Sequence, residues 1–400
     1  MSYRVCPYCF ETFKRSEVMF RCTNEKGCNK EDDSVMHKFW GSTQMELPAI
    51  KPKFSLGSLL DKMPESAVCQ TCGNKSYTMI CPHCHNRIPK DMVEHKGYII
   101  SIIGARSSGK TIYIATLINQ LKKYGIYLDK DLGIIETNVA NRPEYNTEQR
   151  YENDFYNVVF KDSRLPEQTQ ISDIKNRYPL IYKVTQKNKP PLYLVFYDTA
   201  GENFVDPKNI ASNVKFLDHS DSILFLMDTF SIPYVHDKLK LSMELPEIEL
   251  KFDKILANLI THIDESENKI REAFYNKPMA LVFSKIDAII KNEELFRDTS
   301  ISGLNIERNS SFLDGSGINL ADIDEVSNSI STALDENWEQ HNFTKNISNH
   351  FKNAKYFGIS ALGDMPDLST QSIKNLRPYR VLDPLVWILL QFKYSLRIAK

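Results

Sequence analysis

Residues 104–111 read Gly-Ala-Arg-Ser-Ser-Gly-Lys-Thr, an order that fits the phosphate-loop pattern G-x-x-x-x-G-K-[ST]. Glycine and small residues let the backbone curl so that its N–H groups point at a polyphosphate. We expect Lys110 to reach the β- and γ-phosphates and the Thr111 hydroxyl to ligate Mg²⁺. The segment predicts a nucleoside triphosphate site made of Gly104, Ala105, Arg106, Ser107, Ser108, Gly109, Lys110 and Thr111.

Two further motifs follow predicted apolar strands. The strand 192–196 leads into Asp198-Thr199-Ala200-Gly201, a D-x-x-G pattern. A carboxylate at Asp198 can hold Mg²⁺ through water, and the Gly201 N–H can approach the γ-phosphate. The strand 279–283 leads into Ser-Lys-Ile-Asp at 284–287, a variant of the [NT]-K-x-D motif that reads guanine.

The second of these motifs predicts the base. The Asp287 carboxylate can accept from guanine N1–H and the 2-amino group together, while Lys285 lies along the base. Adenine offers a lone pair in place of N1–H, which would leave a desolvated Asp287 unpaired. Ser284 has a shorter reach than the usual Asn or Thr, so ATP stays an alternative nucleotide. The strand 356–359 then leads into a turn that can present an N–H to guanine O6, at Ser360, Ala361 and Leu362.

All eight cysteines lie in the first 84 residues, as four pairs. Two closely spaced pairs supply the four thiolates of a closed tetrahedral zinc site. The ribbon-like spacing favours one site from Cys69, Cys72, Cys81 and Cys84, and a second from Cys6, Cys9, Cys22 and Cys28. The alternative is a cross-brace, in which Cys6 and Cys9 share a metal with one of the late pairs.

Closed thiolate sites leave no open position for catalysis, so we expect two structural Zn²⁺ ions in a docking or scaffolding module. Three histidines near the cysteines are spare candidate ligands, and we expect each to be solvated or part of the core instead. They are His37, His83 and His85.

The elements that must position these residues suggest two parts. We expect an N-terminal Cys-rich module at 1–96 and a doubly wound, mostly parallel α/β domain at 97–400. Insertions are expected at 231–277 and 288–355, the second with an amphipathic helix whose stripe packs on the domain. A C-terminal helix is expected at 383–398, with Asp383 as N-cap and Pro384 in the first turn. The stripe comprises Leu320, Ile323, Val326, Ile330, Leu334 and Trp338.

Bulk properties exclude some classes of protein. The net charge of −1 implies no general attraction to nucleic acid. The longest apolar runs, such as 385–390, are far shorter than the ~20 residues of a membrane span. The N-terminus shows no apolar signal core. We therefore expect a cytoplasmic chain with reduced thiols.

Taken together, residues 97–400 resemble a P-loop GTPase of the Ras and translation-factor type. With the cysteine pairs, the string Pro-Tyr-Arg-Val at 378–381 and the helix start at 383–387, the chain resembles the double-GTPase proteins of bacterial conflict and defence loci. The resemblance implies GTP and GDP as ligands, Mg²⁺ as cofactor, and an effector or second GTPase protein as partner.

Such a protein also needs a first-switch threonine that closes on Mg²⁺ and the γ-phosphate. It should precede the second strand, 178–184, which pairs with 192–196. We choose Thr169 over Thr137 and Thr147. The segment 128–176 is long and polar, as expected of a loop that only nucleotide orders.

Hydrolysis depends on two unusual residues. Glu202 stands where Ras-like proteins have a water-orienting glutamine, so its charge should slow turnover, and Arg106 can supply a cation. We expect slow hydrolysis raised by a partner, with the catalytic set Lys110, Thr169, Gly201, Glu202 and Arg106. The alternatives are a non-hydrolysing GTP-binding scaffold and a zinc-containing GTPase that acts on RNA or the ribosome, although 1–96 has no basic-aromatic cluster.

Overall fold

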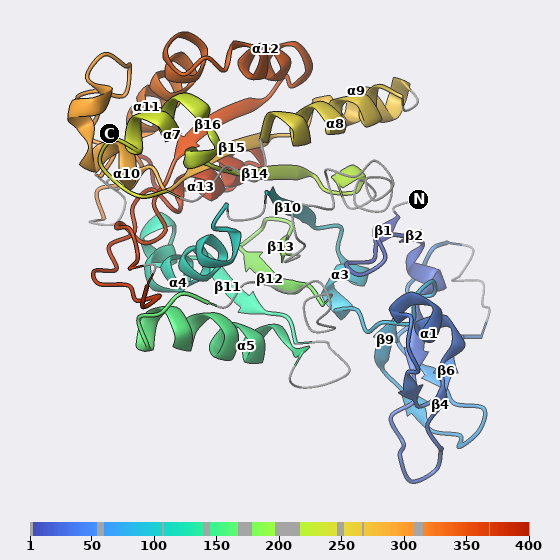
Figure 1. Cartoon of the computed structure of the whole chain (residues 1–400). Coiled ribbons are helices and arrows are strands. Elements are labelled where there is room, and N and C mark those ends of the chain that lie inside the picture. The colour runs from blue at the N-terminus through green and yellow to red at the C-terminus, as the bar shows by residue number, and fades with distance from the viewer. Residues whose placement is uncertain are drawn as a thin grey trace.

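A seven-stranded sheet forms the centre of the computed structural model, in the order β11-β12-β13-β10-β14-β15-β16 (Figure 1). The structure describes residues 3–53, 60–105, 108–138, 145–166, 178–196, 217–245, 252–265, 268–307, 315–367 and 369–399. The strands of the sheet are β10 (Tyr98–Gly104), β11 (Gly133–Glu136), β12 (Leu180–Thr185), β13 (Leu192–Phe196), β14 (Ser222–Asp228), β15 (Met279–Ser284) and β16 (Ala354–Gly358).

Strand direction gathers the predicted motifs. The strands β13, β10, β14, β15 and β16 run parallel, while β11 and β12 are antiparallel additions beside β13. The carboxyl ends of parallel strands meet at one edge of a sheet, where ligands of open α/β sheets bind. We call this the carboxyl edge. It holds the strand-terminal residues Gly104, Phe196, Asp228, Ser284 and Gly358.

Each face of the sheet has its own apolar core, because successive residues of a strand point to opposite faces. In β10, Ile99 and Ile103 enter one core, and Ile100 and Ile102 enter the other. The first core is covered by α7 (Pro233–Leu239), α8 (Phe252–Asp264), α9 (Asn268–Tyr275), α10 (Asp287–Lys291) and α12 (His341–His350). The second is covered by α4 (Lys110–Leu128), the π-helix η3 (Tyr151–Lys161) and α13 (Asp383–Gln391).

The cysteine-rich residues 3–96, the N-terminal module, project from one side of the sheet (Figure 1). Cysteine sulfurs and a few large apolar side chains make its core. Its elements are short, as in small domains that depend on metals. They are β1 (Arg4–Val5), β2 (Thr12–Phe13), η1 (Arg15–Glu17), β3 (Met19–Arg21), β4 (Glu31–Asp32), α1 (Ser34–Trp40), β5 (Met45–Glu46), β6 (Ala49–Ile50), β7 (Ala67–Val68), β8 (Lys75–Ser76), β9 (Thr78–Ile80) and α3 (Lys90–Glu94).

The architecture is the expected doubly wound α/β P-loop fold with an additional cysteine-rich module. The predicted amphipathic stripe lies on α11 (Leu320–Thr332), the π-helix η9 (Ala333–Asn337) and Trp338, which directly follows η9. It is buried except at Leu320, which is 38% exposed. The remaining short helices are α5 (Thr147–Arg150), η6 (Thr229–Ser231) and η7 (Glu293–Phe296). Within the described ranges, no helix combines the length and apolar character that crossing a bilayer requires.

Two expectations are wrong. The C-terminal helix α13 ends at Gln391, because Lys393 has a positive φ of 60° and the chain turns back there. Its N-cap is Leu382, and Asp383 instead pairs with Arg380 at 3.2 Å. The segment 128–176 is not one long loop, because its described part contains β11, α5 and η3.

Candidate functional site

The phosphate loop connects β10 to α4, as the sequence predicts, and two of its glycines have identifiable structural reasons. Gly109 has a φ of 77° directly before the helix, a conformation that favours glycine. A Cβ on Gly104 would lie 2.7 Å from the Leu226 carbonyl oxygen, so only glycine permits this approach. The first turn of α4, with Lys110 and Thr111, therefore starts at the carboxyl edge, and its N–H groups can face an anion there.

The segment 284–287, the predicted base-reading motif, contacts the phosphate loop directly. The Ser284 hydroxyl donates to the Ser108 carbonyl oxygen at 2.8 Å and lies 3.1 Å from the Met227 carbonyl oxygen. Ser284 is 4% exposed, so water does not compete for these bonds. The shorter serine thus still joins β14, β15 and the phosphate loop. This contact places two predicted motifs side by side.

Asp287 contacts Ser360, so the segment 360–362 lies beside the segment 284–287 at the carboxyl edge. Asp287 is 3% exposed, and burial raises the pKa of its carboxyl, while a hydrogen bond with the Ser360 side chain opposes that rise. The Ser360 oxygen accepts from Gly363 N–H at 2.7 Å. Thr116 of α4 donates to the Ala361 carbonyl oxygen at 3.2 Å, and Leu362 is buried beside it. In the described part of the chain, the Ala361 N–H donates no hydrogen bond, so it can serve an acceptor on a base.

Lys285 shows two neighbours that the sequence interpretation missed. Its ammonium pairs with Asp228 at 2.6 Å and lies 5.0 Å from the centre of the Phe230 ring. Asp228 also accepts from the Phe230 N–H at 2.9 Å, so the three residues form one unit. The available signal was an acidic residue at the carboxyl end of a buried strand, because β14 ends at Asp228.

Several predicted residues lie outside the described residues, and their roles stay predictions. The two alternatives to Thr169 have structural roles. The Thr147 hydroxyl donates to the Thr137 carbonyl oxygen and accepts from Ile181 N–H, and Thr137 N–H donates to the Ile181 carbonyl oxygen. Outside the description are Arg106, Ser107, Thr169, Asp198, Gly201 and Glu202.

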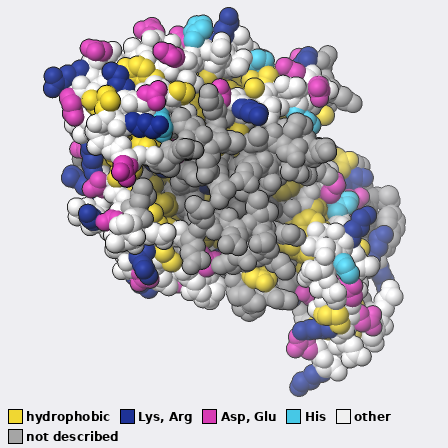
Figure 2. All heavy atoms as spheres, viewed as in Figure 1, with side chains coloured by type: hydrophobic (Ala, Val, Ile, Leu, Met, Phe, Trp, Pro, Cys, Tyr) yellow, Lys and Arg dark blue, Asp and Glu magenta, His cyan; other side chains and the backbone are white. Residues whose placement is uncertain are grey.

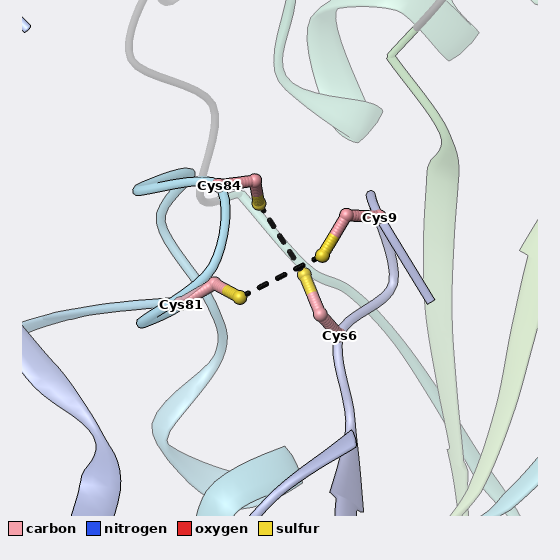
Figure 3. Close-up of side chains that lie close together, drawn as sticks. All are labelled: Cys6, Cys9, Cys81 and Cys84. Carbon is pink, nitrogen blue, oxygen red and sulfur yellow. Dashed lines mark hydrogen bonds between the residues drawn. The ribbon is translucent and has the colours of Figure 1, made fainter. Parts of the chain in front are cut away.

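The eight cysteines form two clusters of four (Figure 3 shows the first). The first cluster is Cys6, Cys9, Cys81 and Cys84, and the second cluster is Cys22, Cys28, Cys69 and Cys72. Neighbouring sulfurs are 3.7–3.8 Å apart in both clusters. A tetrahedral zinc with Zn–S bonds of about 2.3 Å separates its ligands by about 3.8 Å. Both clusters fit the donor set and the spacing of a structural Zn²⁺ site.

The ribbon-like pairing is wrong, and the cross-brace pairing that the sequence left open is the one found. Residues Lys75–Ile80 between the two late pairs form β8 and β9, and an extended run of this length spans about 20 Å. In addition, β9 pairs antiparallel with β3, with Met19 opposite Ile80. Each late pair therefore meets an early pair at a different end of these strands.

Hydrogen bonds from neighbouring groups support the first cluster. The N–H of Tyr8 donates to Cys6 Sγ at 3.4 Å, and Asn86 Nδ2 donates to Cys84 Sγ at 3.3 Å. Donors of this kind stabilise thiolates and orient metal ligands. Burial raises the pKa of the Cys6 thiol, whereas hydrogen bonds with the other cysteines, first of all Cys6, lower that of Cys9. A divalent cation would allow all four sulfurs to be thiolates.

The imidazole rings of the three nearby histidines have partners other than the cysteine sulfurs, although the His83 backbone N–H donates to Cys81 Sγ at 3.4 Å. His37 Nδ1 lies 2.6 Å from Asp32, and His85 Nδ1 lies 2.8 Å from Asp33. His83 Nε2 lies 3.2 Å from the carbonyl oxygen of Thr12. Each pair of residues is a protein contact typical of a solvated or core histidine.

No family model matches the chain. A relative from Mycolicibacterium smegmatis, named "Putative ESX-1 scaffolding and assembly protein SaeC", is 23% identical over 397 residues, which cover 96% of this chain and 97% of the relative. Two solved structures are similar to parts of this chain. The Arl6 BBS3 small GTPase from Trypanosoma brucei is 10% identical, with a TM-score of 0.30 over 74% of this chain and 98% of that one. The Ski7 GTPase-like domain of S. cerevisiae bound to GTP is 11% identical, with a TM-score of 0.32 over 75% and 50%.

Proposed function

We propose that this chain is a Mg²⁺-dependent GTP-binding protein that hydrolyses GTP slowly and acts as a nucleotide switch for a partner protein. The observation that carries the proposal is the hydrogen bond between Ser284 and Ser108, which joins the predicted base-reading and phosphate-binding segments. Sites for a base and for a polyphosphate at one edge of a parallel sheet are what a nucleotide requires.

The predicted phosphate-binding, metal-binding and base-reading residues have separate tasks in this proposal. The α4 N-terminus and Lys110 would bind the phosphates, and Thr111 would hold Mg²⁺, with Asp198 acting through water. Asp287 would accept from the guanine N–H groups, and Ala361 would donate to O6. Asp228 would keep the Lys285 side chain in place along the base. Mg²⁺, when bound, would neutralise part of the phosphate charge.

Hydrolysis and the switch are the finer part of the proposal. Thr169 and Gly201 would contact the γ-phosphate and release it after cleavage. Glu202 would hold the attacking water less well than glutamine because its charge repels the phosphates, and Arg106 would reduce that repulsion. The two cysteine clusters would each hold one structural Zn²⁺.

A protein is the partner that the observations favour. The mycobacterial relative is named as a scaffolding and assembly protein, and the resemblance to double-GTPase proteins of defence loci points to an effector or second GTPase. Figure 2 shows Lys and Arg side chains interspersed with Asp and Glu over the described part of one face, as expected of a chain with a net charge of −1. A nucleic acid would favour a basic patch instead. We place the protein in the cytoplasm.

Calorimetric titration of the full chain with GTP, GDP and ATP, combined with metal analysis, tests the proposal. We expect GTP and GDP to bind with Mg²⁺, ATP to bind at least a hundredfold more weakly, and about two zinc ions per chain. Asp287→Ala should remove the preference for guanine. The matched control is Asp364→Ala, because Asp364 is a nearby but part-exposed carboxylate paired with Lys291. Metal-loaded protein that ignores GTP would contradict the proposal.

Phosphate release measured with and without added partner proteins separates the slow GTPase from a non-hydrolysing scaffold. We expect slow release that Glu202→Gln increases, because glutamine orients water without adding negative charge. Absence of release under every condition would leave GTP binding but remove the enzyme.

A further inference from the structure

The first cluster is connected to the sheet by a continuous series of contacts. Asn86 donates from Nδ2 to Cys84 Sγ at 3.3 Å, and its Oδ1 accepts from Trp40 Nε1 at 3.1 Å. The Trp40 ring stacks on the Tyr178 ring, with centroids 4.3 Å apart and an interplanar angle of 19°. Tyr178 lies two residues before β12. Three side chains therefore link a metal ligand to the sheet.

Each link is buried. Asn86 is 1% exposed, and Trp40 and Tyr178 are each 4% exposed. Buried hydrogen bonds and ring contacts have no water to replace them, so a displacement at one end must be absorbed at the other. A second contact reinforces the series, because the Tyr8 ring meets the Tyr178 ring edge-on at 6.1 Å. The Tyr8 N–H donates to Cys6 Sγ.

Tyr178 is at the carboxyl edge of the sheet. Leu180 pairs with Phe196 in the antiparallel register of β12 and β13, and Phe196 is the carboxyl end of a strand parallel to β10. The D-x-x-G motif begins only two residues after Phe196, at Asp198. Arg150 also donates to the Tyr178 carbonyl oxygen. A displacement of Tyr178 would therefore be transmitted through β12 to the carboxyl end of β13. That end leads into the D-x-x-G motif, whose Gly201 is predicted to contact the γ-phosphate.

The contacts of the second cluster, within the described residues, stay inside the N-terminal module. Its sulfurs contact one another, and they also accept hydrogen bonds from the backbone N–H groups of Asn24, Thr71 and Cys72. The Cys22 N–H donates to the Pro48 carbonyl oxygen, which is also in the N-terminal module. The molecule therefore contains two similar predicted metal sites, of which the first is connected by side-chain contacts to the sheet domain, 97–400. The second cluster is an internal control for the first.

We propose that metal bound at the first cluster is energetically coupled to GTP binding through Asn86, Trp40 and Tyr178. This inference rests on the proposed GTP-binding function. Trp40 and Asn86 are positioning residues, because they act through Tyr178 and β12 rather than on the nucleotide. Coupling between two binding events is reciprocal, so GTP tightens metal binding at the first cluster by the factor by which that metal tightens GTP binding.

The test uses the zinc-loaded full chain and Trp40→Phe, which retains a ring but cannot donate to Asn86. We expect GTP binding to weaken about five- to tenfold and GDP binding less than twofold, because the predicted contact of Gly201 in the D-x-x-G motif is with the γ-phosphate, which GDP lacks. Tyr77→Phe is the control, since Tyr77 is a 63% exposed aromatic residue of the same module and should change neither affinity.

The reciprocal measurement follows zinc transfer to a competing chelator. In the unmodified chain, GTP should raise the affinity for one of the two zinc ions about five- to tenfold and leave the other unchanged. In the Trp40→Phe variant, GTP should not change the affinity for either zinc ion. This readout does not depend on hydrolysis. A structural role of Trp40 alone would not make zinc retention depend on GTP.

The outcomes separate the two proposals. If the unmodified chain does not bind GTP, the proposed function fails. If it binds GTP and Trp40→Phe binds equally well with both zinc ions retained, the coupling is overturned while the function stands. If Trp40→Phe loses a zinc ion, the GTP affinity of Tyr178→Leu tests the coupling instead. Tyr178 lies outside the module, so its replacement should leave both zinc ions bound. Unchanged GTP affinity in that variant would overturn the coupling.

Discussion

The two cysteine clusters have the same ligands and nearly the same sulfur spacing, yet they differ in their surroundings. The first cluster is backed by Tyr8 and Asn86, whose contacts continue to Tyr178 at the carboxyl edge. The sulfurs of the second cluster contact one another and backbone N–H groups of the same module. The ligands therefore predict a structural metal ion at both clusters. The residues around the first cluster also contact the sheet domain, 97–400, whereas the contacts given for the second cluster stay inside the N-terminal module.

A buried ion pair lies between the two clusters. Arg21, which precedes Cys22, pairs with Asp33 at 2.7 Å, and His85, which follows Cys84, lies 2.8 Å from the same carboxylate. Burial opposes ionisation of Asp33, but hydrogen bonds with His85 and Arg21 hold its pKa below the ordinary value. Because one carboxylate serves residues adjacent to both clusters, the fold of the module connects them.

Removal of both metals should have the largest effect. Metal binding contributes on the order of 10–16 kcal/mol to the folding of small zinc domains. The module is small and has few large apolar side chains, so we expect that it cannot fold without its metals. We expect a chelator to make residues 1–96 sensitive to protease while residues 97–400 stay protected. Limited proteolysis followed by mass spectrometry measures this and also tests the domain boundary. A module that stays protected after both zinc ions have left would show that metals do not hold it together.

Replacement of the shared carboxylate should have the next largest effect. Asp33→Ala leaves Arg21 buried without its charge partner, which costs about 3–5 kcal/mol. Urea unfolding followed by zinc release measures the loss, and both ions should leave at a lower urea concentration. Asp32→Ala is the matched control, because the adjacent carboxylate pairs with the exposed His37 and should leave the midpoint unchanged. Early release of only one ion would mean that the clusters unfold separately.

Short-range signals made the phosphate loop and its strand predictable. The loop needs glycine where φ is positive, as at Gly109, and a buried parallel strand is apolar at every position, as in β10. The positions of the segments 284–287 and 360–362 were predictable for the same reason, because each follows a buried strand, whereas their role in reading a base stays a prediction. Strand order then placed Ser284 beside Ser108.

The cysteine pairing was not predictable from spacing. It depends on β3 pairing with β9, two short strands about sixty residues apart in the sequence. Three-residue strands carry almost no sequence pattern, since their pairing is decided by the surrounding core. Asp228 was missed for a related reason. An acidic residue after a strand becomes informative only when Lys285 is seen beside it.

The segment 128–176 was misjudged although part of its signal was present. Tyr151, Phe155 and Val159 recur every four residues, and all three are buried against α4 and the sheet. The polar residues between them concealed a helical stripe. The early end of α13 had no such signal. Lys393 has a positive φ, and the preceding Phe392 stacks on Tyr98, a residue of β10 that is distant in the sequence.

Single cysteine replacements sharpen the contrast between the clusters. Cys81→Ser and Cys69→Ser should each reduce the zinc content from two ions to one, because three thiolates bind zinc much less tightly than four. We expect GTP affinity to fall about tenfold in Cys81→Ser, while Cys69→Ser should change it less than twofold. Equal losses in the two variants would mean that the module acts as a whole and that proximity to Tyr178 is irrelevant.

The smallest expected effect isolates the ring contact itself. Trp40→Leu and Tyr178→Leu each remove one partner of the stack, and the double variant removes both. Aromatic pairs contribute about 0.5–1.5 kcal/mol beyond their buried area, so the GTP affinities of the four proteins should give a coupling energy of about 1 kcal/mol. The zinc content of each variant must be two, because the cycle has meaning only with both metals in place.

If the single losses add without coupling, Tyr178 influences the nucleotide through Arg150 or Tyr8 instead, since both also contact it. The cycle then has to be repeated with Tyr8, whose backbone holds Cys6, and a coupling there would still connect the first cluster to the sheet by a different ring.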